Sequence, residues 1–294
     1  MVPLYTKAFG HTYSTEEIKR KFLDPYQKIQ CSSALQTDDG SIASFYGVIY
    51  QHVRWKDQTF DIVQSCDSMT DPDHGGRGLF VRLAQEVYEC LRSKKVGFVF
   101  GFPNKTIYGL RVKKLHWQHF EDINCFRKKI LTAPLAVVAK KWPVFKTLYR
   151  RYCSHVLRKY KSNCGFFENS AITESRGGVI HDKDYFKYKG GADKYLLKLN
   201  GKCFWIKIDG YLWVGDFEVM SRSEFRQAFS TLSSLARVLG CERILFHFHE
   251  GSPNDLLLKS VMPVFHSVPY GFKVLNEQMK HIKLNFVAAD FDTW

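Results

Sequence analysis

The stretch Asp71-Pro-Asp-His-Gly-Gly-Arg-Gly-Leu-Phe80 indicates the fold of this chain more strongly than any other segment. It lies between a strand-like run, 60–70, and an amphipathic helix-like run, 79–93. Three glycines in four residues directly before a helix predict a concave row of free backbone N–H groups. Such a row lies at the positive end of the helix dipole, where a phosphate binds well. A flexible connector before a helix would show the same glycines, because short glycine motifs are weak signals.

The composition favours a globular protein of two domains with a polyanionic partner. The chain has 294 residues, enough for two domains of about 150 residues each, and its formal net charge is +14. That charge favours a phosphorylated small molecule, a nucleic acid or an anionic membrane as partner. No apolar stretch reaches about 18 residues and the first residues lack a signal-peptide pattern, so we expect a cytoplasmic protein. The eight cysteines include no Cys-x-x-Cys pair, which predicts reduced core cysteines rather than a zinc site or a disulfide framework.

The first half predicts three antiparallel strands in a row, then the glycine loop, then alternating helices and strands. Ser14 with Glu17 forms a capping box that starts a helix before the first hairpin. The helix after the loop carries apolar residues at i, i+3 and i+4 spacing, and a further helix opens at Asn104. The predicted strands are 3–9, 28–36, 41–55, 59–70, 96–102 and 121–129.

This order of elements, together with the loop, resembles the GNAT superfamily of CoA-dependent N-acyltransferases. In that family a strand ends in Val-x-Pro and runs into Arg/Gln-x-x-Gly-x-Gly/Ala, whose amides hold the CoA pyrophosphate. Here Thr70-Asp-Pro72 matches the strand end, and Gly75-Gly-Arg-Gly-Leu-Phe80 matches the loop. Gly75 replaces the Arg or Gln, so Arg77 is the candidate source of positive charge, and Phe80 replaces the final small residue. The resemblance implies an α+β fold with a mixed, mostly antiparallel sheet flanked by helices.

A narrower resemblance concerns the acceptor. The run Val63-Gln-Ser-Cys-Asp-Ser-Met-Thr70, with Gly101-Phe-Pro-Asn104 after the next strand, is similar to acyltransferases of amino-sugar and surface-polysaccharide synthesis. This similarity implies acyl-CoA as donor and a nucleotide-linked amino sugar as acceptor, in a pathway of the O-antigen or capsule type.

The middle of the chain is strongly basic. Residues 126–161 contain eleven Lys or Arg and no acid, and their apolar residues recur near helical spacing. One interpretation is a helical linker, 131–170, whose apolar stripe packs on both domains while its charges are solvated. The same pattern is typical of peripheral contact with an anionic membrane. It would also attract a nucleic acid, or the phosphates of CoA and of a nucleotide sugar.

The second half repeats the first. Phe98-Val-Phe-Gly-Phe-Pro-Asn104 is echoed by Phe246-His-Phe-His-Glu-Gly-Ser-Pro-Asn254, which indicates an internal duplication. Between Val219 and Phe225 there is no glycine nest, so we expect a single acyl-CoA site, in domain 1–130, and a degenerate GNAT-like domain at 171–294. The predicted elements are helices at 181–189, 221–239 and from 252, and strands at 194–199, 203–208, 212–219, 243–249 and 282–291.

The resemblance implies a donor site built mainly from backbone. The backbone at Met69 and Thr70 would pair with the pantetheine. Asn104 matches a position that contacts CoA, and it is also a helix cap. The amides that would hold the pyrophosphate are those of Gly75, Gly76, Arg77, Gly78 and Leu79.

Acylating an amine requires a neutral nucleophile, a positioned thioester carbonyl and a proton for the departing thiolate. Strand alternation predicts Ser65, Asp67 and Met69 on one face, directed at the acceptor. Asp67 is the candidate proton acceptor or sugar-orienting group, with a structural hydrogen-bonding role as the alternative. The tyrosine that the family implies is replaced by Val112, so Tyr108, one turn earlier, is the substitute candidate, with a core position as the alternative.

His247 and His249 share one face of the strand predicted at 243–249. They are candidate acceptor-binding residues, with structural roles as the alternative. A spacing of two on a strand suits a metal, but no third ligand is evident nearby in the sequence, so we expect no metal.

The sequence thus predicts an acyl-CoA-dependent N-acyltransferase. Its acyl group would be acetyl or a short hydroxyacyl such as 3-hydroxybutanoyl, and its acceptor a dTDP-linked amino-deoxyhexose such as a 3-amino-3,6-dideoxyhexose. The first alternative is a Fem-like transferase that takes its acyl group from aminoacyl-tRNA; the leading hypothesis includes no nucleic-acid partner. The second is a catalytically inactive binding protein of the same fold, suggested by Gly75 and Val112.

Overall fold

The computed structural model describes residues 1–10, 13–161 and 167–294, which form two compact units. Unit 1 comprises Met1–Glu121 and Pro269–Ile282, and unit 2 comprises Asp122–Val268 and Lys283–Trp294. This division differs from the expected one of 1–130, 131–170 and 171–294. Residues 131–161 are part of unit 2, while 162–166 of the expected linker lie outside the described residues.

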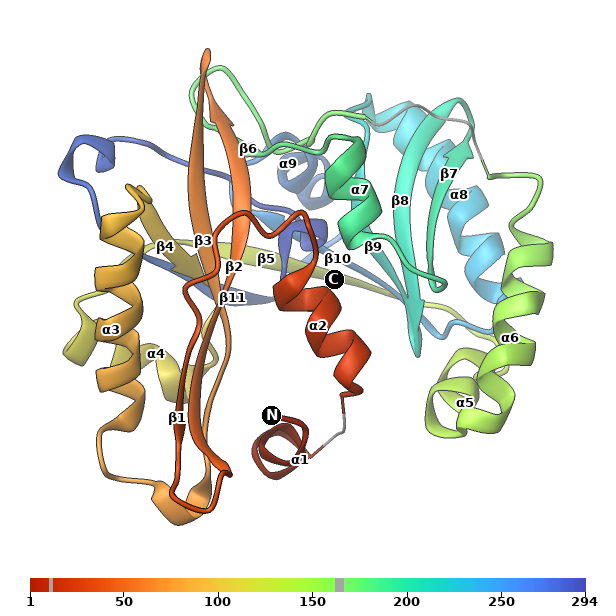
Figure 1. Cartoon of the computed structure of the whole chain (residues 1–294). Coiled ribbons are helices and arrows are strands. Elements are labelled where there is room, and N and C mark those ends of the chain that lie inside the picture. Colours follow the sequence, from red (N-terminus) through yellow and green to blue (C-terminus); the bar gives the residue numbers. More distant parts are fainter. Residues whose placement is uncertain (11–12, 162–166) are drawn as a thin grey trace. The chain divides into compact units, whose positions relative to one another are not determined.

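The sheet of unit 1 begins with an antiparallel meander and continues with a parallel strand (Figure 1). A last strand, β11, lies antiparallel to β4 through Gly271–Val274, and its residues from Pro269 onward belong to unit 1. In sheet order the strands are β1 (Ser33–Gln36), β2 (Ile42–Trp55), β3 (Gln58–Thr70), β4 (Phe98–Gly101) and β11 (Val264–Val274).

Four α-helices belong to unit 1: α1 (Val2–Phe9), α2 (Thr15–Leu23), α3 (Leu79–Ser93) and α4 (Lys105–Leu115). The capping box of Ser14 and Glu17 is confirmed at the start of α2. The strand predicted at 3–9 is wrong, because α1 occupies these residues. Pro3 lies in the first turn of α1 and Gly10 ends it at φ 71°, which are favourable helix-start and helix-stop positions for these residues. Two short 3₁₀ helices, η1 (Pro72–His74) and η2 (Glu277–Met279), complete the unit.

Helices cover both faces of this sheet (Figure 1). On one face, α3 packs its predicted apolar stripe, from Leu83 to Leu91, against the side chains of β2, β3 and β4. On the other face, Leu4 and Tyr5 of α1 and Phe22 of α2 pack against β2 and β3. The long strand β3 therefore presents each of its faces to a different pair of helices.

Unit 2 repeats this order of elements. Three antiparallel strands are followed by a helix, a strand parallel to the third, and a second helix. The fifth strand, β5, lies antiparallel to β10. In sheet order the strands are β5 (Gln118–Lys129), β10 (Arg243–His249), β9 (Tyr211–Phe217), β8 (Lys202–Asp209) and β7 (Lys194–Leu199). The turn at Asn200-Gly201 has positive φ at both residues, as a two-residue hairpin of this sequence requires.

The helices of unit 2 pack on different faces of its sheet. Phe225 of α8 contacts the ring of Phe217 on one face, and Phe186 of α7 contacts the ring of Trp205 on the other. The remaining elements of unit 2 are α5 (Leu135–Lys141), α6 (Pro143–Val156), β6 (Gly178–Val179), α7 (Lys183–Lys189), α8 (Arg222–Val238), α9 (Pro253–Lys259) and η3 (Ala288–Asp290).

The strand predicted at 282–291 is wrong. This segment is buried, which explains its strand-like apolar pattern, but it contains the 3₁₀ helix η3 and only isolated bridges. Apolar patterning reports burial, whereas a strand also requires a partner in register.

The cysteines depart in part from the prediction. Cys66, Cys125, Cys153 and Cys241 are free and buried, as expected, but Cys31 and Cys90 form a disulfide. The two lie 59 residues apart in the sequence and meet because α3 packs on the side of the sheet where Cys31 lies. Cys164 lies outside the described residues. In the part of the chain that the structure describes, no helix is long and apolar enough to cross a bilayer.

Candidate functional site

The glycine loop connects β3 to α3 and is anchored at its start by Asp71. The Asp71 carboxylate accepts a hydrogen bond from the backbone N–H of Asp73 at 3.1 Å. It also pairs with the Lys7 ammonium of α1 at 2.7 Å. The hydrogen bond from Lys7 holds the pKa of Asp71 below its usual value. The negative charge of Asp71 is therefore already compensated where the loop begins.

The loop leaves backbone N–H groups open at the start of α3. Gly76 and Gly78 have φ of 73° and 71°, a conformation that favours glycine, and a Cβ at either position would meet no heavy atom within 4 Å. Gly78 is the N-cap of α3 and supplies no side-chain cap. Among the described residues, the N–H groups of Gly76, Arg77 and Gly78 have no hydrogen-bond partner. Free donors at the positive end of a 15-residue helix suit a phosphate group.

Directly before the loop, β3 and β4 separate. Their parallel pairing covers Val63 with Val99 and Gln64 with Phe100, after which β4 ends at Gly101 while β3 continues to Thr70. In the described chain, no strand pairs with β3 on this side beyond Gln64. The result is a fork whose inner edge offers backbone donors and acceptors to an extended ligand.

A β-bulge lies on β3 beside this fork. Gly47 pairs with Cys66 and Phe45 with Met69, so Asp67 and Ser68 together oppose one residue of β2. Asp67 has φ of 47°, and both Cys66 and Met69 belong to the core beneath α1 and α2. The prediction that Ser65, Asp67 and Met69 share one face by simple alternation is therefore wrong, because a bulge shifts the alternation by one residue.

Asp67 joins β3 to both N-terminal helices. The Tyr5 hydroxyl donates to its carboxylate at 2.5 Å, and the Lys21 ammonium lies 2.6 Å away. The side chains of Asp67 and Lys21 are 11% and 13% exposed, so the pair is largely shielded from water. Burial and the neighbouring Asp67 charge raise the pKa of Tyr5. These contacts give Asp67 a structural role, and its predicted role as proton acceptor stays a prediction.

The structure adds a residue that the sequence did not single out. Arg111 of α4 is only 4% exposed, and its Nη2 donates to the Ser65 hydroxyl at 2.9 Å. Its guanidinium stacks 4.4 Å from the centre of the Trp117 ring. Nε and Nη1 have no hydrogen-bond partner among the described residues. A Cβ on Gly101 would come within 2.8 Å of Nη1, so the cation lies beside the last residue of β4 at the fork.

Position alone could not have revealed Arg111 in the sequence. It is one of the many basic residues of the chain, and it precedes Val112, the residue at the family's tyrosine position. Val112 is 37% exposed, whereas Arg111 is buried. The available signal was a single arginine within an otherwise apolar turn next to His116-Trp117.

The other predicted residues of unit 1 are placed as follows. The Asn104 side chain accepts a hydrogen bond from the N–H of Ile107 at 3.0 Å, which confirms its capping role. The half-buried Tyr108 packs its ring edge-on against His119 at 5.8 Å. Met69 is buried, and Thr70 shares a hydrogen bond with Ser44 at 2.9 Å. Contacts of these residues with a ligand stay predictions.

His247 and His249 lie on β10 in unit 2. His249 is fully buried, and its backbone N–H donates to Phe286 at 3.0 Å. His247 packs edge-on against Trp213 at 5.4 Å and also faces His266. Burial, with a smaller contribution from His266, lowers the pKa of His247 to about 4. Both histidines have structural surroundings of their own, and their predicted acceptor contacts stay predictions.

Comparison with known proteins agrees with this geometry. Residues 1–111 match the model of an acetyltransferase (GNAT) domain. No curated protein matches the chain. The similar solved structures include GCN5-related N-acetyltransferases from Anabaena variabilis ATCC 29413 and Kribbella flavida, and a probable N-acyltransferase from Enterococcus faecalis V583.

These three structures resemble the chain in fold but share little sequence with it. The Anabaena protein is 13% identical with a TM-score of 0.55, and the alignment covers 93% of this chain and 69% of that one. The Kribbella protein is 12% identical with a TM-score of 0.54, covering 93% and 68%. The Enterococcus protein is 14% identical with a TM-score of 0.54, covering 93% and 69%.

The glycine loop, the fork and Arg111 all fall within residues 1–111. Domains of this family use acyl-CoA as donor and an amine as acceptor. The predicted α+β fold is confirmed as the GNAT fold. Residues 1–111 are thus similar to GNAT acetyltransferase domains in sequence, and the chain is similar to solved N-acyltransferases in fold.

Proposed function

We propose that this protein transfers an acyl group from acyl-CoA to the amine of a nucleotide-linked amino sugar. The acceptor would be a dTDP-linked amino-deoxyhexose such as a 3-amino-3,6-dideoxyhexose, and the acyl group acetyl or a short hydroxyacyl such as 3-hydroxybutanoyl. The observation that carries the donor half is the row of free N–H groups from Gly76 to Gly78 at the start of α3. The net charge of +14 supports two phosphate-bearing substrates. Both are metabolites that a cytoplasmic enzyme would meet.

The reaction breaks one bond and forms another. The neutral amine attacks the thioester carbon, the C–N bond forms, and the C–S bond breaks with its electron pair moving to sulfur. One proton leaves the attacking nitrogen, and one proton is taken up by the thiolate or the solvent. The protein must therefore keep the amine neutral and stabilise negative charge on the departing sulfur.

Arg111 is suited to the second task. Its guanidinium is always charged, is shielded from water, and keeps Nε and Nη1 free of partners among the described residues. A buried cation without a counter-charge is costly, and an anion formed beside it reduces that cost. We assign Arg111 the stabilisation of the departing thiolate, with Ser65 as its positioning partner. Asp67 and Tyr108 stay candidates for moving the proton of the amine.

Unit 2 is proposed to be a second, degenerate GNAT-like domain. The order β7-β8-β9-α8-β10-α9 repeats β1-β2-β3-α3-β4-α4, and β10 is parallel to β9 as β4 is to β3. Each unit also carries a register shift in the hairpin before its long helix, at Phe45/Gly47 in unit 1 and Trp205/Ile206 in unit 2. Irregularities at matching places support a duplication more strongly than strand order alone.

The test is release of free thiol from acetyl-CoA and 3-hydroxybutanoyl-CoA, each offered with a panel of dTDP- and UDP-amino sugars. Release that depends on one sugar identifies both substrates together. Thiol release with other amines only would keep the donor site and overturn the sugar. Absence of both release and CoA binding would overturn the donor site itself.

The same assay separates the alternatives. A Fem-like enzyme would release no thiol but would bind aminoacyl-tRNA with a steep dependence on salt. An inactive binding protein would bind CoA without turnover. Contact of 126–161 with an anionic membrane is a separate proposal, because a different surface supports it.

A further inference from the structure

Large apolar side chains are concentrated on the outer surface of α5 and α6 in unit 2. Of the sixteen exposed large apolar residues in the described chain, eight lie between 131 and 152. The most exposed are Leu131 at 94%, Val144 at 79% and Leu148 at 68%. We call this surface the α5–α6 patch; it consists of Leu131, Leu135, Val138, Trp142, Val144, Phe145, Leu148 and Tyr152. The linker interpretation expected an apolar stripe of this segment to be packed, and six residues of the patch belong to that stripe, from Leu135 to Tyr152; each of them is at least 37% exposed.

The packing of the two helices on the rest of unit 2 explains why the patch is exposed. Val144, Leu148 and Tyr152 recur at every fourth residue and so share one face of α6. The neighbouring face is fixed to unit 2, because the hydroxyls of Tyr149 and Tyr152 donate to the carbonyls of Leu239 and Val238, both at 2.7 Å.

In α5 the small residues Ala136 and Ala139 are buried, while the larger residues Leu135 and Val138 are 44% and 41% exposed. This reverses the usual order, in which large apolar residues are buried first. Exposed large apolar residues gathered in one segment in this way are typical of an interaction site.

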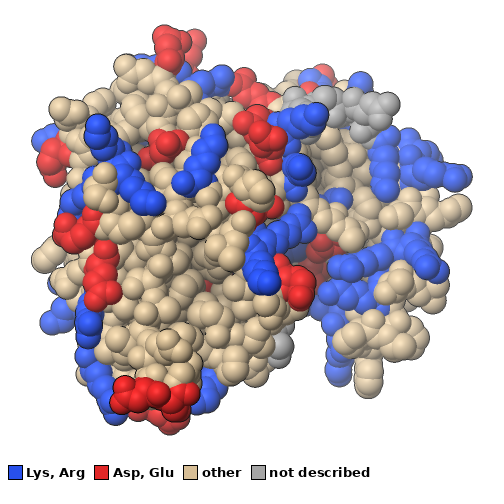
Figure 2. Space-filling view, in the orientation of Figure 1, with Lys and Arg blue, Asp and Glu red and all other residues tan. Residues whose placement is uncertain are grey.

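Positive charge surrounds the patch. Figure 2 shows Lys and Arg gathered among uncharged residues over α5 and α6. Residues 126–161 contain no acid, and Lys140 is the basic residue of this segment that pairs with a carboxylate, Asp209, at 2.9 Å. The remaining cations of the segment are therefore available to an external anion.

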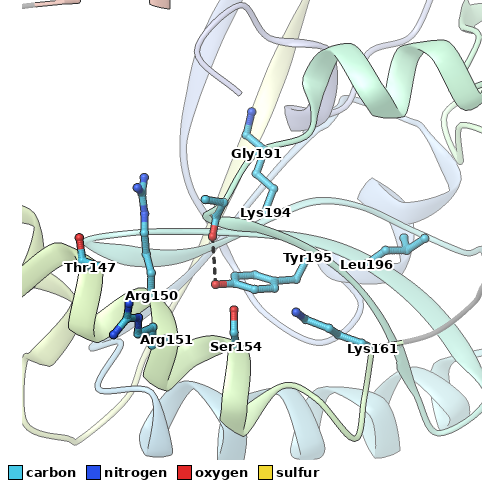
Figure 3. A pocket seen from close by; sticks show the side chains of 10 residues that line it. Thr147, Arg150, Arg151, Ser154, Lys161, Gly191, Lys194, Tyr195 and Leu196 are labelled. Atoms are coloured by element: carbon cyan, nitrogen blue, oxygen red, sulfur yellow. Dashed lines mark hydrogen bonds between the residues drawn. The ribbon is translucent and has the colours of Figure 1, made fainter.

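Three of these cations line a cavity on the flank of α6. The cavity measures about 550 Å³, and Arg150, Arg151 and Lys161 lie around it together with the hydroxyls of Thr147 and Ser154 (Figure 3). The Tyr195 hydroxyl beside them donates to the backbone of Ala192 at 3.2 Å. No carboxylate is among the residues described around this cavity. Its chemistry suits a phosphate group.

We propose that the α5–α6 patch docks on the surface of an anionic lipid bilayer. The apolar side chains enter the boundary between head groups and acyl chains, and the cavity beside Arg150 and Lys161 takes a lipid phosphate. A basic rim around an exposed apolar stripe is the pattern of interfacial helices. The proposal is independent of the acyl-transfer reaction.

Charge favours a membrane over a protein as the occupant. A second copy of the chain would present the same cations and be repelled. Protein interfaces are depleted in lysine, whereas Lys141 and Lys146 lie between residues of the patch in the sequence. A uniformly anionic surface satisfies all of these charges together.

The test is sedimentation of the full chain with vesicles of phosphatidylglycerol and phosphatidylcholine, against vesicles of phosphatidylcholine alone. We expect binding to the anionic vesicles that weakens as salt is raised. The double variant V144S/L148S should bind at least tenfold more weakly. The matched control is V219S/L256S, which removes two exposed apolar residues of unit 2 outside the patch and should bind as the parent chain does.

A charge-reversal variant, R150E/R151E, tests the cavity and should also bind the anionic vesicles at least tenfold more weakly than the parent chain. Circular dichroism verifies that each variant is folded. Equal binding to both vesicle types, no binding to either, or equal loss in the control variant would overturn the proposal. A dimer in solution that V144S/L148S dissociates would assign the patch to self-association instead and would overturn it as well.

Discussion

The two long helices of this protein, α3 and α8, begin in opposite ways. The start of α3 has no side-chain cap, since Gly78 stands at the N-cap position. The start of α8 is closed by its own residues: the Ser221 hydroxyl accepts from the N–H of Glu224 at 3.3 Å, and the Glu224 carboxylate accepts from the N–H of Ser221 at 2.8 Å. One helix start is open to an anion, and the other carries an anion of its own.

The difference shows how the cap of a helix determines whether its first N–H groups stay open to an anion. A helix start has four N–H groups without partners inside the helix, and either side chains or a ligand must satisfy them. A capping box adds stability by about 1 kcal/mol and removes the binding capacity. The start of α8 in unit 2 is capped by its own side chains, whereas the N–H groups at the start of α3 in unit 1 stay open to a ligand.

The two units also differ in how many partners their buried charged side chains have. In unit 2, the buried Asp216 accepts hydrogen bonds from Ser170 and Phe217 and lies 3.6 Å from His181, which in turn contacts Asp290 at 2.8 Å. In unit 1, the buried Arg111 lies in no such network and keeps two N–H positions free among the described residues. The unpaired charge of Arg111 supports the proposal that the chemistry takes place in unit 1.

The variant with the largest expected effect is Gly78→Glu, which tests whether the open start of α3 binds CoA. This change places a side chain and a negative charge at the open helix start, and we expect CoA affinity to fall at least 100-fold in calorimetric titration. The control is Gly10→Glu, because Gly10 has the same φ of 71° and ψ of 10° at the end of α1 and shares the backbone strain. Normal CoA affinity in Gly78→Glu would remove the glycine loop from the donor site.

Arg111→Met tests the uncompensated charge. We expect kcat to fall about 100-fold with the Kd for CoA nearly unchanged, because the lost interaction exists only as the thiolate departs. The Tm should hold or rise, since an unpaired buried charge is replaced by an apolar side chain of similar length. Arg111→Lys should recover part of the rate. A variant with normal kcat and a lowered Tm would give Arg111 a structural role only.

Asp67→Asn separates the structural role of the β3 bulge from catalysis. The change removes the Asp67 charge from beside the largely shielded Lys21 ammonium, so we expect the unfolding free energy to fall by about 2 kcal/mol in urea denaturation. Asp71→Asn is the control, because its partner Lys7 is half exposed and such pairs contribute below about 1 kcal/mol. A loss of turnover in Asp67→Asn without loss of stability would support the catalytic role instead.

The buried aspartate of unit 2 predicts a pH dependence. Burial raises the pKa of Asp216 from 3.8 to about 6, so the folded state holds this proton more tightly than the unfolded chain does. Its contribution to stability is therefore full below pH 3.8 and is lost as pH rises through about 6, by about 3 kcal/mol. Urea denaturation between pH 3.5 and 7 should show this slope in the parent chain and not in Asp216→Asn. An identical slope in both would refute the assignment.

The smallest effect is expected at the closed helix start. Ser221→Ala should lower unfolding free energy by about 1 kcal/mol and leave CoA affinity as it is. Ser14→Ala, at the equivalent capping box of α2, should cost a similar amount. If Ser221→Ala instead bound a second CoA molecule at the start of α8, the cap alone would account for the difference between the two helix starts.

Local signals were predicted well from the sequence. The bounds of α3 and β10, both capping boxes and the Asn200-Gly201 turn depend on residues a few positions apart, and all are confirmed. Errors arose where distant segments decide. The segment 282–291 lacks a partner in register, and the pairing of Cys31 with Cys90 joins segments far apart in the chain. The helix at 3–9 is the exception, because its signals, Pro3 and Gly10, are local.

The sequence by itself determined the glycine loop, the basic middle segment and the repeated order of elements, because glycine conformation, charge and periodicity are properties of neighbouring residues. Only the tertiary structure decided which residues face which way. The β3 bulge moved Asp67 toward α1 and α2, the fork of β3 and β4 isolated Arg111, and the anchoring of α6 turned its apolar face outward. Register and packing between distant segments set these orientations, and a linear pattern does not encode them.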